Sequence, residues 1–407
     1  MSDKREEFAR GWPVLVASAL GSGVGVAPLA FYSLGAFIKP LTQEFGWSRA
    51  QVTGASLALG LGMLATGSLV GGFADRFGAR RVVLFSQLIL AAVLSSLALI
   101  TSNVWSFYLA YFALGALAAG TLPITWSRAV TGWFVHARGL ALGLSLVGTG
   151  IVGSLLPSLV TWLSNWVGWR GAYVGLAALP ILVGMPITLL WFREPEDNAR
   201  QRATVSNASW GFTLRQVIAR WRFWQMACAF LIAAIVIGGI NVNALPLLSD
   251  RGIDRGVAAA IVGLIGATVA IARLISGYLL DRFSGSRVAF VMLGVPAGAC
   301  LILSAAGANL PLCALAIILI GFAAGAEHDI AAYFAARYFG RRHYGAIYGL
   351  MYSLYTFGSG VGPPLAGAVY DKTGNYQAAL YAGAVLFSLA AVFVGTLGAY
   401  PRTDEPL

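Results

Sequence analysis

The stretch GGFADRFGARR, Gly71 to Arg81, has a second copy 206 residues further along the chain, GYLLDRFSGSR, Gly277 to Arg287. The tripeptide Asp-Arg-Phe falls in register in the two copies. The same offset pairs other prolines and glycines: Pro40 with Pro246, Gly139 with Gly345, Gly143 with Gly349, Pro157 with Pro363, and Gly168 with Gly374. So many special residues at one offset predict an internal repeat, with one copy in each half of the chain.

Long apolar runs surround both copies. Of the 407 residues, 58% are hydrophobic and 11% are charged, against roughly 25% charged in soluble domains, and the mean hydropathy is +0.77. Such a chain lacks the polar side chains to cover a soluble surface, which excludes an ordinary soluble enzyme. The net charge of +11 does not indicate a nucleic-acid partner, because the charges sit in short clusters between the apolar runs. Three cysteines inside apolar runs, Cys228, Cys300 and Cys313, argue against a disulfide framework.

The apolar runs are long enough to cross a membrane as helices, which takes about 20 residues each. The run 82–127 divides at the polar turn 101–103, and the run that begins at 288 divides at 307–311. The sequence therefore predicts an all-α membrane protein with twelve transmembrane helices in two six-helix repeats. Residues 12–38 are expected to be a retained first span rather than a signal peptide. The expected domains are an N-terminal six-helix bundle over 1–192, a cytoplasmic linker over 193–220 and a C-terminal six-helix bundle over 221–407.

The basic residues orient the chain in the membrane. An even number of spans places both termini on one side, and nineteen Lys and Arg residues fall on that side against six on the other. Because basic residues are enriched in cytoplasmic loops, we expect both termini in the cytoplasm and the protein in the cytoplasmic (inner) membrane.

Two six-helix repeats are one of the architectures of secondary transporters, with a binding site between the halves near the midplane. Twelve spans with G-x-x-x-D-R-x-G-x-R-R after the second helix, and a weaker copy after the eighth, resemble the major facilitator superfamily over the whole chain. Within it, WFVHARGLALGLSLVGTGIVG, Trp133 to Gly153, resembles the signature of monocarboxylate transporters. The stretches YSLGAFIKPLTQEFGWSRA, Tyr32 to Ala50, and Gly325 to Asp371 resemble bacterial monocarboxylate and oxalate–formate type carriers.

The resemblance implies roles for several charged residues, and a monomer. It implies a cytoplasmic interlock, in which charged loops pack across the two halves and hold one conformation until transport breaks them. The matching residues are Asp75, Arg76, Arg80, Arg81, Asp281 and Arg282. In the families that this chain resembles, the arginine that matches Arg273 binds the substrate carboxylate. The chain departs from them at Val269, where animal carriers have an aspartate, and it lacks the lysine of oxalate–formate type carriers on the eleventh helix.

Arg273 is also singled out by chemistry, because it lies inside an apolar run on the eighth helix. A guanidinium does not readily lose its proton, and its burial costs several kcal/mol unless it is paired or hydrated. Its planar fork suits a carboxylate. We expect Arg273 to bind a substrate carboxylate, and the alternative is an internal salt bridge to Glu327 or Asp329.

Three ionisable residues, Glu327, His328 and Asp329, lie in a row on the tenth helix. Ionisable groups at membrane depth indicate a functional site. Adjacent helical residues point about 100° apart, so the three do not line the same cavity. We expect one of them to carry a proton, and the alternative is a structural clasp to Arg128, Arg337 or the eleventh helix.

Other polar side chains in the apolar runs are further candidates. Arg128, which follows Thr121 and Thr125 at helical spacing on the fourth helix, is predicted to be a gate on a wet face. Tyr348, Tyr352 and Tyr355 form a stripe on the eleventh helix. Phenols need hydrogen-bond partners inside a membrane, so this stripe is expected to face the cavity, with core packing as the alternative. Tyr111 on the fourth helix is a further candidate for the substrate site, as is Tyr32 on the first, which is near the position where the animal monocarboxylate carriers that the chain resembles have a lysine.

The pattern Gly-Gly-Ile-Asn-Val-Asn before Pro246 permits a local break in the seventh helix. An amide of Asn241 or Asn243 is then expected to reach the substrate.

These features together predict a proton-coupled carrier of a small organic monocarboxylate. The expected partners are that anion, protons and the lipid bilayer. The chain has no G-x-x-x-x-G-K-[ST] loop and no metal motif, so neither ATP, a cofactor nor a metal is expected, and the protein is not an enzyme. A carboxylate exchanger and an organic-acid efflux carrier are the alternatives. A membrane sensor is disfavoured because the cytoplasmic segments are too short for a signalling domain.

Overall fold

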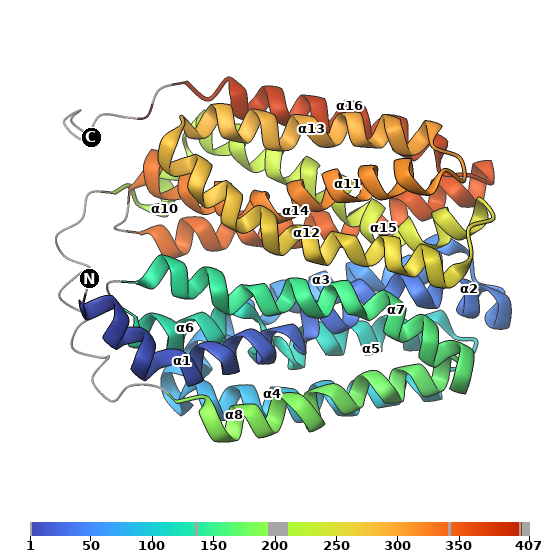
Figure 1. The fold of residues 1–407 in the computed structure, drawn as a ribbon, viewed down its shortest axis with the longest axis horizontal. Coiled ribbons are helices and arrows are strands. Elements are labelled where there is room, and N and C mark those ends of the chain that lie inside the picture. The colour runs from blue at the N-terminus through green and yellow to red at the C-terminus, as the bar shows by residue number, and fades with distance from the viewer. Residues whose placement is uncertain (1, 135–136, 194–210, 341–342, 399, 401–407) are drawn as a thin grey trace.

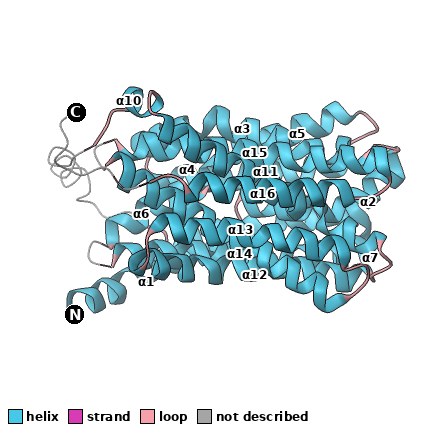
Figure 2. Ribbon diagram, turned by 90° about the horizontal axis from the view of Figure 1, so that it is seen from above, coloured by secondary structure: helices cyan, strands magenta, loops and turns pink. Residues whose placement is uncertain are grey.

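The structure is a computed structural model, and it describes residues 2–134, 137–193, 211–340, 343–398 and 400. The helices run nearly parallel along the long axis, and α1 begins at the same end at which α16 finishes (Figure 1). We call this the termini end and the opposite end the distal end. A view turned by 90° shows helices and no strand in the described part (Figure 2).

The described helices form two groups that we call the first and second bundle. The first bundle holds α1 (Ser2–Gly23), the π-helix η1 (Pro28–Tyr32), α2 (Ser33–Phe45), α3 (Arg49–Phe77), α4 (Ala79–Ser96), the 3₁₀ turn η2 (Leu97–Leu99), α5 (Val104–Leu117), the 3₁₀ turn η3 (Ala119–Thr121), α6 (Pro123–Trp133), α7 (Arg138–Leu179), the π-helix η4 (Pro180–Gly184) and α8 (Met185–Trp191). After the short α10 (Leu214–Ile218), the second bundle holds α11 (Trp221–Asp250), α12 (Arg255–Arg282), α13 (Gly285–Ala305), α14 (Leu310–Phe339), α15 (Tyr344–Thr373) and α16 (Gln377–Gly395).

These helices make twelve passes between the two ends of the described structure. Eight helical stretches are long and apolar enough to cross a membrane by length and composition. One of them, Leu140–Trp191, is two passes that turn at Gly168, where φ is 74°. The other passes are α3, α5 continued by α6, and α15. The prediction of a twelve-helix membrane fold is therefore confirmed.

The distal turns repeat the internal symmetry of the sequence. Gly46 and Gly252 have φ of 69° and 83°, and Gly168 and Gly374 have φ of 74° and 72°. The members of each pair are 206 residues apart. Side chains with a Cβ rarely adopt a positive φ, so glycine at these positions lets each pair of antiparallel helices turn sharply.

Helices α7 and α12 join the two bundles through glycines. A Cβ built on Gly266 of α12 lies 2.4 Å from the carbonyl oxygen of Gly150, so the two backbones are in direct contact. Gly143 and Gly277 lie on these same faces, seven and eleven residues nearer the termini end. No other part of the described chain lies within 4 Å of a Cβ built on either.

Helices α3 and α15 repeat this arrangement. A Cβ built on Gly360 of α15 lies 2.9 Å from the carbonyl oxygen of Ser56, and the Ser56 hydroxyl donates to the Gly360 carbonyl at 2.8 Å. Gly349 lies on the same face, eleven residues nearer the termini end, with nothing else of the described chain within 4 Å of a built Cβ. The bundles therefore contact each other in the distal half and separate toward the termini end.

Gly148 provides a test of the packing inside the first bundle. A Cβ built on it lies 1.8 Å from the carbonyl oxygen of Ala19 on α1. We expect Gly148→Ala to lower the free energy of unfolding by about 1–3 kcal/mol, because α1 and α7 must move apart. The midpoint of thermal unfolding in detergent measures this. The control is Gly298→Ala, where the space is open and alanine favours the helix by about 0.5–1 kcal/mol, so equal midpoints for the two variants would contradict the packing.

Candidate functional site

Arg273 lies where the two bundles begin to separate. It follows Gly266 by seven residues on α12 and shares the face that Gly266 presents to α7. The side chain is half-buried, and its Nε has no hydrogen-bond partner among the described residues. Ion pairs between described residues are found elsewhere, and neither Glu327 nor Asp329 forms one with Arg273 within 4.0 Å. The guanidinium is thus left without the internal salt bridge that was its alternative interpretation.

Tyrosines from both bundles lie within electrostatic range of this guanidinium. Arg273 interacts electrostatically with Tyr32 of the first bundle and with Tyr348 and Tyr352 of α15. Tyr32 is the last residue of η1, and its ring lies 3.4 Å from a Cβ built on Gly153 of α7. A helical spacing of four residues puts Tyr348 and Tyr352 on one face of α15. The structure therefore gathers around Arg273 three of the phenols that the sequence singled out.

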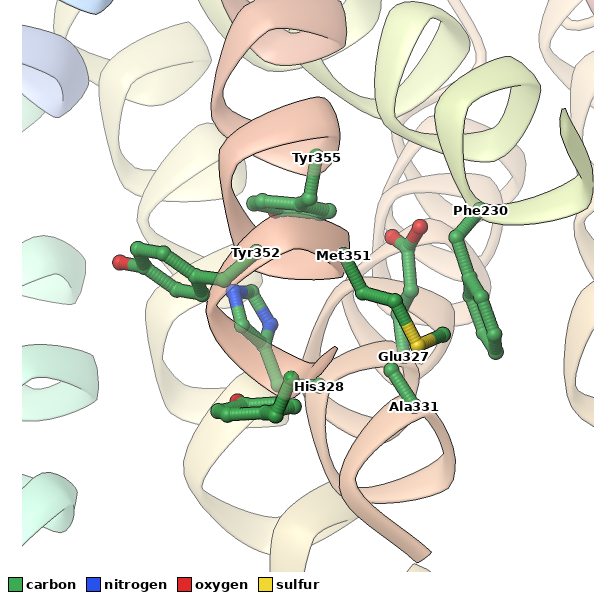
Figure 3. A pocket seen from close by; sticks show the side chains of 8 residues that line it. Phe230, Glu327, His328, Ala331, Met351, Tyr352 and Tyr355 are labelled. Atoms are coloured by element: carbon green, nitrogen blue, oxygen red, sulfur yellow. The ribbon is translucent and has the colours of Figure 1, made fainter. Parts of the chain in front are cut away.

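A small cavity lies beside this site, inside the second bundle (Figure 3). Its volume is about 10 Å³, and side chains of α11, α14 and α15 line it: Phe230, Glu327, His328, Ala331, Tyr348, Met351, Tyr352 and Tyr355. The ring of His328 lies 4.2 Å from that of Tyr355 and 5.7 Å from that of Tyr352, measured between centroids. In Figure 3 the Tyr352 hydroxyl points away from the Glu327 carboxyl. His328 therefore lies against the tyrosines of α15 that line the cavity together with it.

The three ionisable residues of α14 have different surroundings, in agreement with their angular spacing. Asp329 accepts a hydrogen bond at 2.9 Å from the hydroxyl of Ser276 on α12 and interacts electrostatically with Arg273. His328 lies against the rings of α15. Glu327 is 1% exposed and lies in the cavity with Phe230 and Met351.

Tyr111 does not belong to this site. It is fully buried inside the first bundle, where its hydroxyl lies 3.2 Å from that of Tyr173 and its ring lies 4.8 Å from that of Phe107. The two phenols satisfy each other, so Tyr111 is part of the core of the first bundle, and the prediction that it faces substrate is wrong for this conformation.

The predicted break at the two asparagines is also wrong, because α11 runs unbroken through them. The Asn243 amide nitrogen donates to the carbonyls of Gly239 and Pro363, at 2.9 and 3.2 Å, and its oxygen accepts from the hydroxyl of Tyr376 at 3.1 Å. These bonds occupy the amide and leave it unavailable to a substrate. Asn241 is 8% exposed, on the unbroken helix.

The fourth pass is interrupted at Pro123, so the predicted continuous face of Thr121, Thr125 and Arg128 does not form in the described structure. Thr121 belongs to η3, and Pro123 starts a separate helix, α6, that carries Thr125 and Arg128. Thr121 and Thr125 are buried, and the Thr121 hydroxyl accepts from the backbone N–H of Val26 at 2.9 Å. Arg128 is half-buried on α6.

A set of charges at the distal end joins the two bundles, and we call Lys39, Arg49, Asp250 and Asp371 the distal latch. Asp250 of α11 pairs with Lys39 of α2 at 2.9 Å and with Arg49 of α3 at 2.6 Å. Asp371 of α15 accepts the backbone N–H groups of Arg49 and Ala50, both at 2.9 Å. These contacts fasten the first turn of α3 to the second bundle.

Two tyrosines complete the distal latch around Arg49. Its guanidinium lies 3.5 Å from the ring centroid of Tyr370 and donates at 2.9 Å to the hydroxyl of Tyr376. Burial raises the pKa of the Tyr376 phenol, so the hydroxyl stays protonated and donates onward to Asn243. From the sequence, Lys39 and Arg49 serve only to orient the chain in the membrane, and Asp250 and Asp371 have no predicted role. The sequence does contain a signal for the latch, because charges of opposite sign lie at the distal ends of helices from the two halves.

The expected interlock lies at the termini end. The side chains of Asp75 and Asp281 lie outside the described residues. Arg80 donates to the Leu189 carbonyl, and Arg282 lies 4.5 Å from the ring centroid of Tyr278. Arg76 and Arg81 are exposed. The contacts of Arg80 and Arg282 stay within one bundle, in keeping with the separation of the bundles at this end.

Comparisons with known proteins agree with this geometry. The family model of the Major Facilitator Superfamily matches residues 20–326 and 240–406. The chain is 28% identical to monocarboxylate transporter 13 of Rattus norvegicus, covering 94% of this chain and 88% of the relative, and 25% identical to the gallate transporter of Pseudomonas putida, covering 89% of each. The crystal structure of a bacterial homologue of the human lysosomal transporter Spinster, inward-facing and unoccupied, has a similar fold, with a TM-score of 0.73 at 18% identity over 94% of this chain and 96% of that one. With its twelve helices, its repeat and these matches, the chain belongs to the major facilitator superfamily of membrane transporters.

Proposed function

We propose that this transporter carries a small organic monocarboxylate across the cytoplasmic membrane by alternating access, in symport with a proton. The observation that carries the proposal is Arg273, a half-buried guanidinium at the junction of the bundles, with no ion pair among the described residues and with phenols of both bundles around it. The monocarboxylate and gallate transporters among the relatives support the same class of substrate.

The chemistry of the site favours an anion with one carboxylate. A guanidinium binds a carboxylate through two parallel hydrogen bonds, and such bonds are strong where water is scarce. Tyr32 and Tyr352 add hydroxyl groups and flat apolar rings near that carboxylate. An anion bound there would balance a charge whose burial is otherwise costly.

The contacts between the bundles support alternating access. The distal latch and the glycine contacts close the distal half, and the same helix faces are apart toward the termini end. Arg273 lies at the boundary, where rocking of the bundles, 1–192 and 221–407, would expose it to one side or the other. With the excess of basic residues at the termini end, we place that end in the cytoplasm and the transporter, as a monomer, in the inner membrane.

Uptake by proteoliposomes tests the function and separates it from exchange. We expect an inward proton gradient to drive accumulation of a labelled monocarboxylate, with L-lactate and benzoate as probes of small and aromatic acids. One pH unit stores about 1.4 kcal/mol, which supports about tenfold accumulation at one proton per anion. Uptake that ignores the gradient and requires internal carboxylate would contradict symport and establish the exchanger. Absence of binding and uptake for both acids, in protein that is folded, would contradict the proposed substrate class.

A further inference from the structure

Glu327 lies in the interior of the second bundle with 1% of its surface exposed, and neither carboxyl oxygen has a hydrogen-bond partner among the described residues. An ionised carboxylate in such a place is strongly unfavourable, because nothing replaces its lost hydration. A protonated carboxyl group has no charge to compensate. The surroundings therefore favour the neutral acid in this conformation.

Among the described residues, no cation is found in the groups that line the cavity with Glu327. From α11 the cavity receives Phe230, and from α15 it receives Met351 and three tyrosines, Tyr348, Tyr352 and Tyr355. Helix α12 contributes nothing to the lining, although its Arg273 interacts electrostatically with His328. The Tyr355 hydroxyl has the Ser359 side chain as a hydrogen-bond partner. Asp329 has partners that Glu327 lacks, because it accepts a hydrogen bond from the Ser276 hydroxyl and interacts electrostatically with the positive charge of Arg273.

The cavity beside Glu327 also has polar atoms that a proton path requires. Both Glu327 oxygens are buried without a hydrogen-bond partner in the described chain. His328 Nδ1 is also buried, and the imidazole has the backbone of Ala324, one turn earlier on α14, as its partner within the protein. A volume of about 10 Å³ is close to the space that one water molecule needs, and a buried water requires two to four polar partners. A single water between the imidazole and the carboxyl group fits both conditions.

We propose that Glu327 and His328 form the proton-binding site of the transporter, bridged by one water, and that Asp329 is a clasp to Ser276 rather than the proton carrier. A proton from the aqueous side of Arg273 binds one imidazole nitrogen, a proton leaves the other nitrogen for the water, and the water passes one to the Glu327 carboxylate. This proposal rests on the proposed symport, since it names the group that carries its proton.

The position of Arg273 supplies the coupling between anion and proton. Its positive charge repels a proton that arrives on His328. A carboxylate bound to Arg273 neutralises that charge and so favours loading of Glu327 through His328. By linkage, a proton on Glu327 or His328 must favour binding of the anion in return.

An infrared measurement tests the site without any substrate. We expect wild-type protein in liposomes at neutral pH to show the C=O stretch of a protonated carboxyl group, to lose it in Glu327→Gln and to keep it in Asp329→Asn. Absence of the band from wild type, or its loss in Asp329→Asn instead, would overturn the proposal.

Chemical labelling is a second test. In wild type, dicyclohexylcarbodiimide, which modifies protonated carboxyl groups in apolar surroundings, should label Glu327, as mapped by mass spectrometry. Labelling of Asp329 alone would also overturn it, and this readout does not depend on whether the glutamine variant folds.

A transport measurement separates this proposal from the substrate proposal. Glu327→Gln should keep exchange of labelled benzoate or L-lactate across a vesicle without a pH gradient, and should lose at least tenfold of the accumulation that a proton gradient drives. Loss of exchange together with accumulation would assign Glu327 to the anion and overturn its proton role. Failure of wild type to respond to a proton gradient would instead overturn the symport, whatever the infrared spectra show.

Discussion

Uptake by the Arg273→Gln variant is expected to fall below detection, while the variant remains folded. Removing one partner of a buried charge pair costs about 2–5 kcal/mol, which lowers affinity for the anion by about 30-fold to several thousand-fold. Arg273→Lys is expected to be intermediate, because it keeps the charge and loses the two-pronged geometry. Binding of benzoate and L-lactate to purified protein, followed by thermal shift, and uptake by proteoliposomes measure both effects.

The stability of the same variant distinguishes a ligand from a structural residue. Arg273 makes no ion pair among the described residues, so replacing it breaks no salt bridge and removes the cost of burying its charge, which should leave the unfolding midpoint unchanged or raise it. Arg287→Gln is the matched control, because Arg287 is exposed at the start of α13 and its loss should change neither uptake nor stability. Full uptake by Arg273→Gln, or a large fall in its midpoint, would show that the arginine serves the fold.

The sequence singles out Arg273 because a permanent charge in an apolar run has few possible roles. The same reasoning fails for Tyr111 and Asn243, which lie in equally apolar runs. A neutral phenol or amide can be satisfied by hydrogen bonds inside the protein without a charged partner. The partners are distant in the sequence: Tyr173 is 62 residues from Tyr111, and Tyr376 and Pro363 are 133 and 120 residues from Asn243. Nothing in the local pattern identifies such a partner, so a polar residue in a membrane helix is a weaker indication of a substrate site than a charge.

The fold is predictable for a similar reason. The membrane thickness fixes the length of each apolar run, so the runs can be counted from the sequence, and the repeat at an offset of 206 residues is visible in the sequence itself. The break in the fourth pass at Pro123 is not predictable from the sequence. Proline occupies the first position of α6, but other prolines lie inside the continuous helices α11 and α15. Which of the two occurs depends on neighbouring helices, and this is why the predicted face of Thr121, Thr125 and Arg128 is wrong.

The distal latch was not predicted, and its removal should have the second largest effect. Arg49→Ala is expected to shift the transporter toward a conformation open at the distal end. The variant loses the ion pair with Asp250 and the contacts with Tyr370 and Tyr376. The side chains of the ion pair are 10% exposed for Arg49 and 23% exposed for Asp250. Since the pair is partly exposed, we expect a shift of about 1–3 kcal/mol, or about 5–150-fold in the ratio of the two conformations.

A cysteine at Ser56 reports this shift, because Ser56 is 2% exposed at the contact of α3 with α15. In a Cys228→Ser background, a water-soluble thiol reagent should modify Ser56→Cys slowly, and the addition of Arg49→Ala should speed the modification by the same 5–150-fold as the conformational ratio. Lys372→Ala is the matched control, since Lys372 is an exposed cation next to Asp371 that lies outside the distal latch. Equal rates in the two variants would contradict a closing role.

Asp250→Asn should act like Arg49→Ala. Because both substitutions break the same ion pair, the shift in conformational free energy of the double variant should be smaller than the sum of the shifts of the two single variants. Full additivity would mean that Arg49 and Asp250 stabilise their own helices separately, and that the distal half is held closed by the glycine contacts alone.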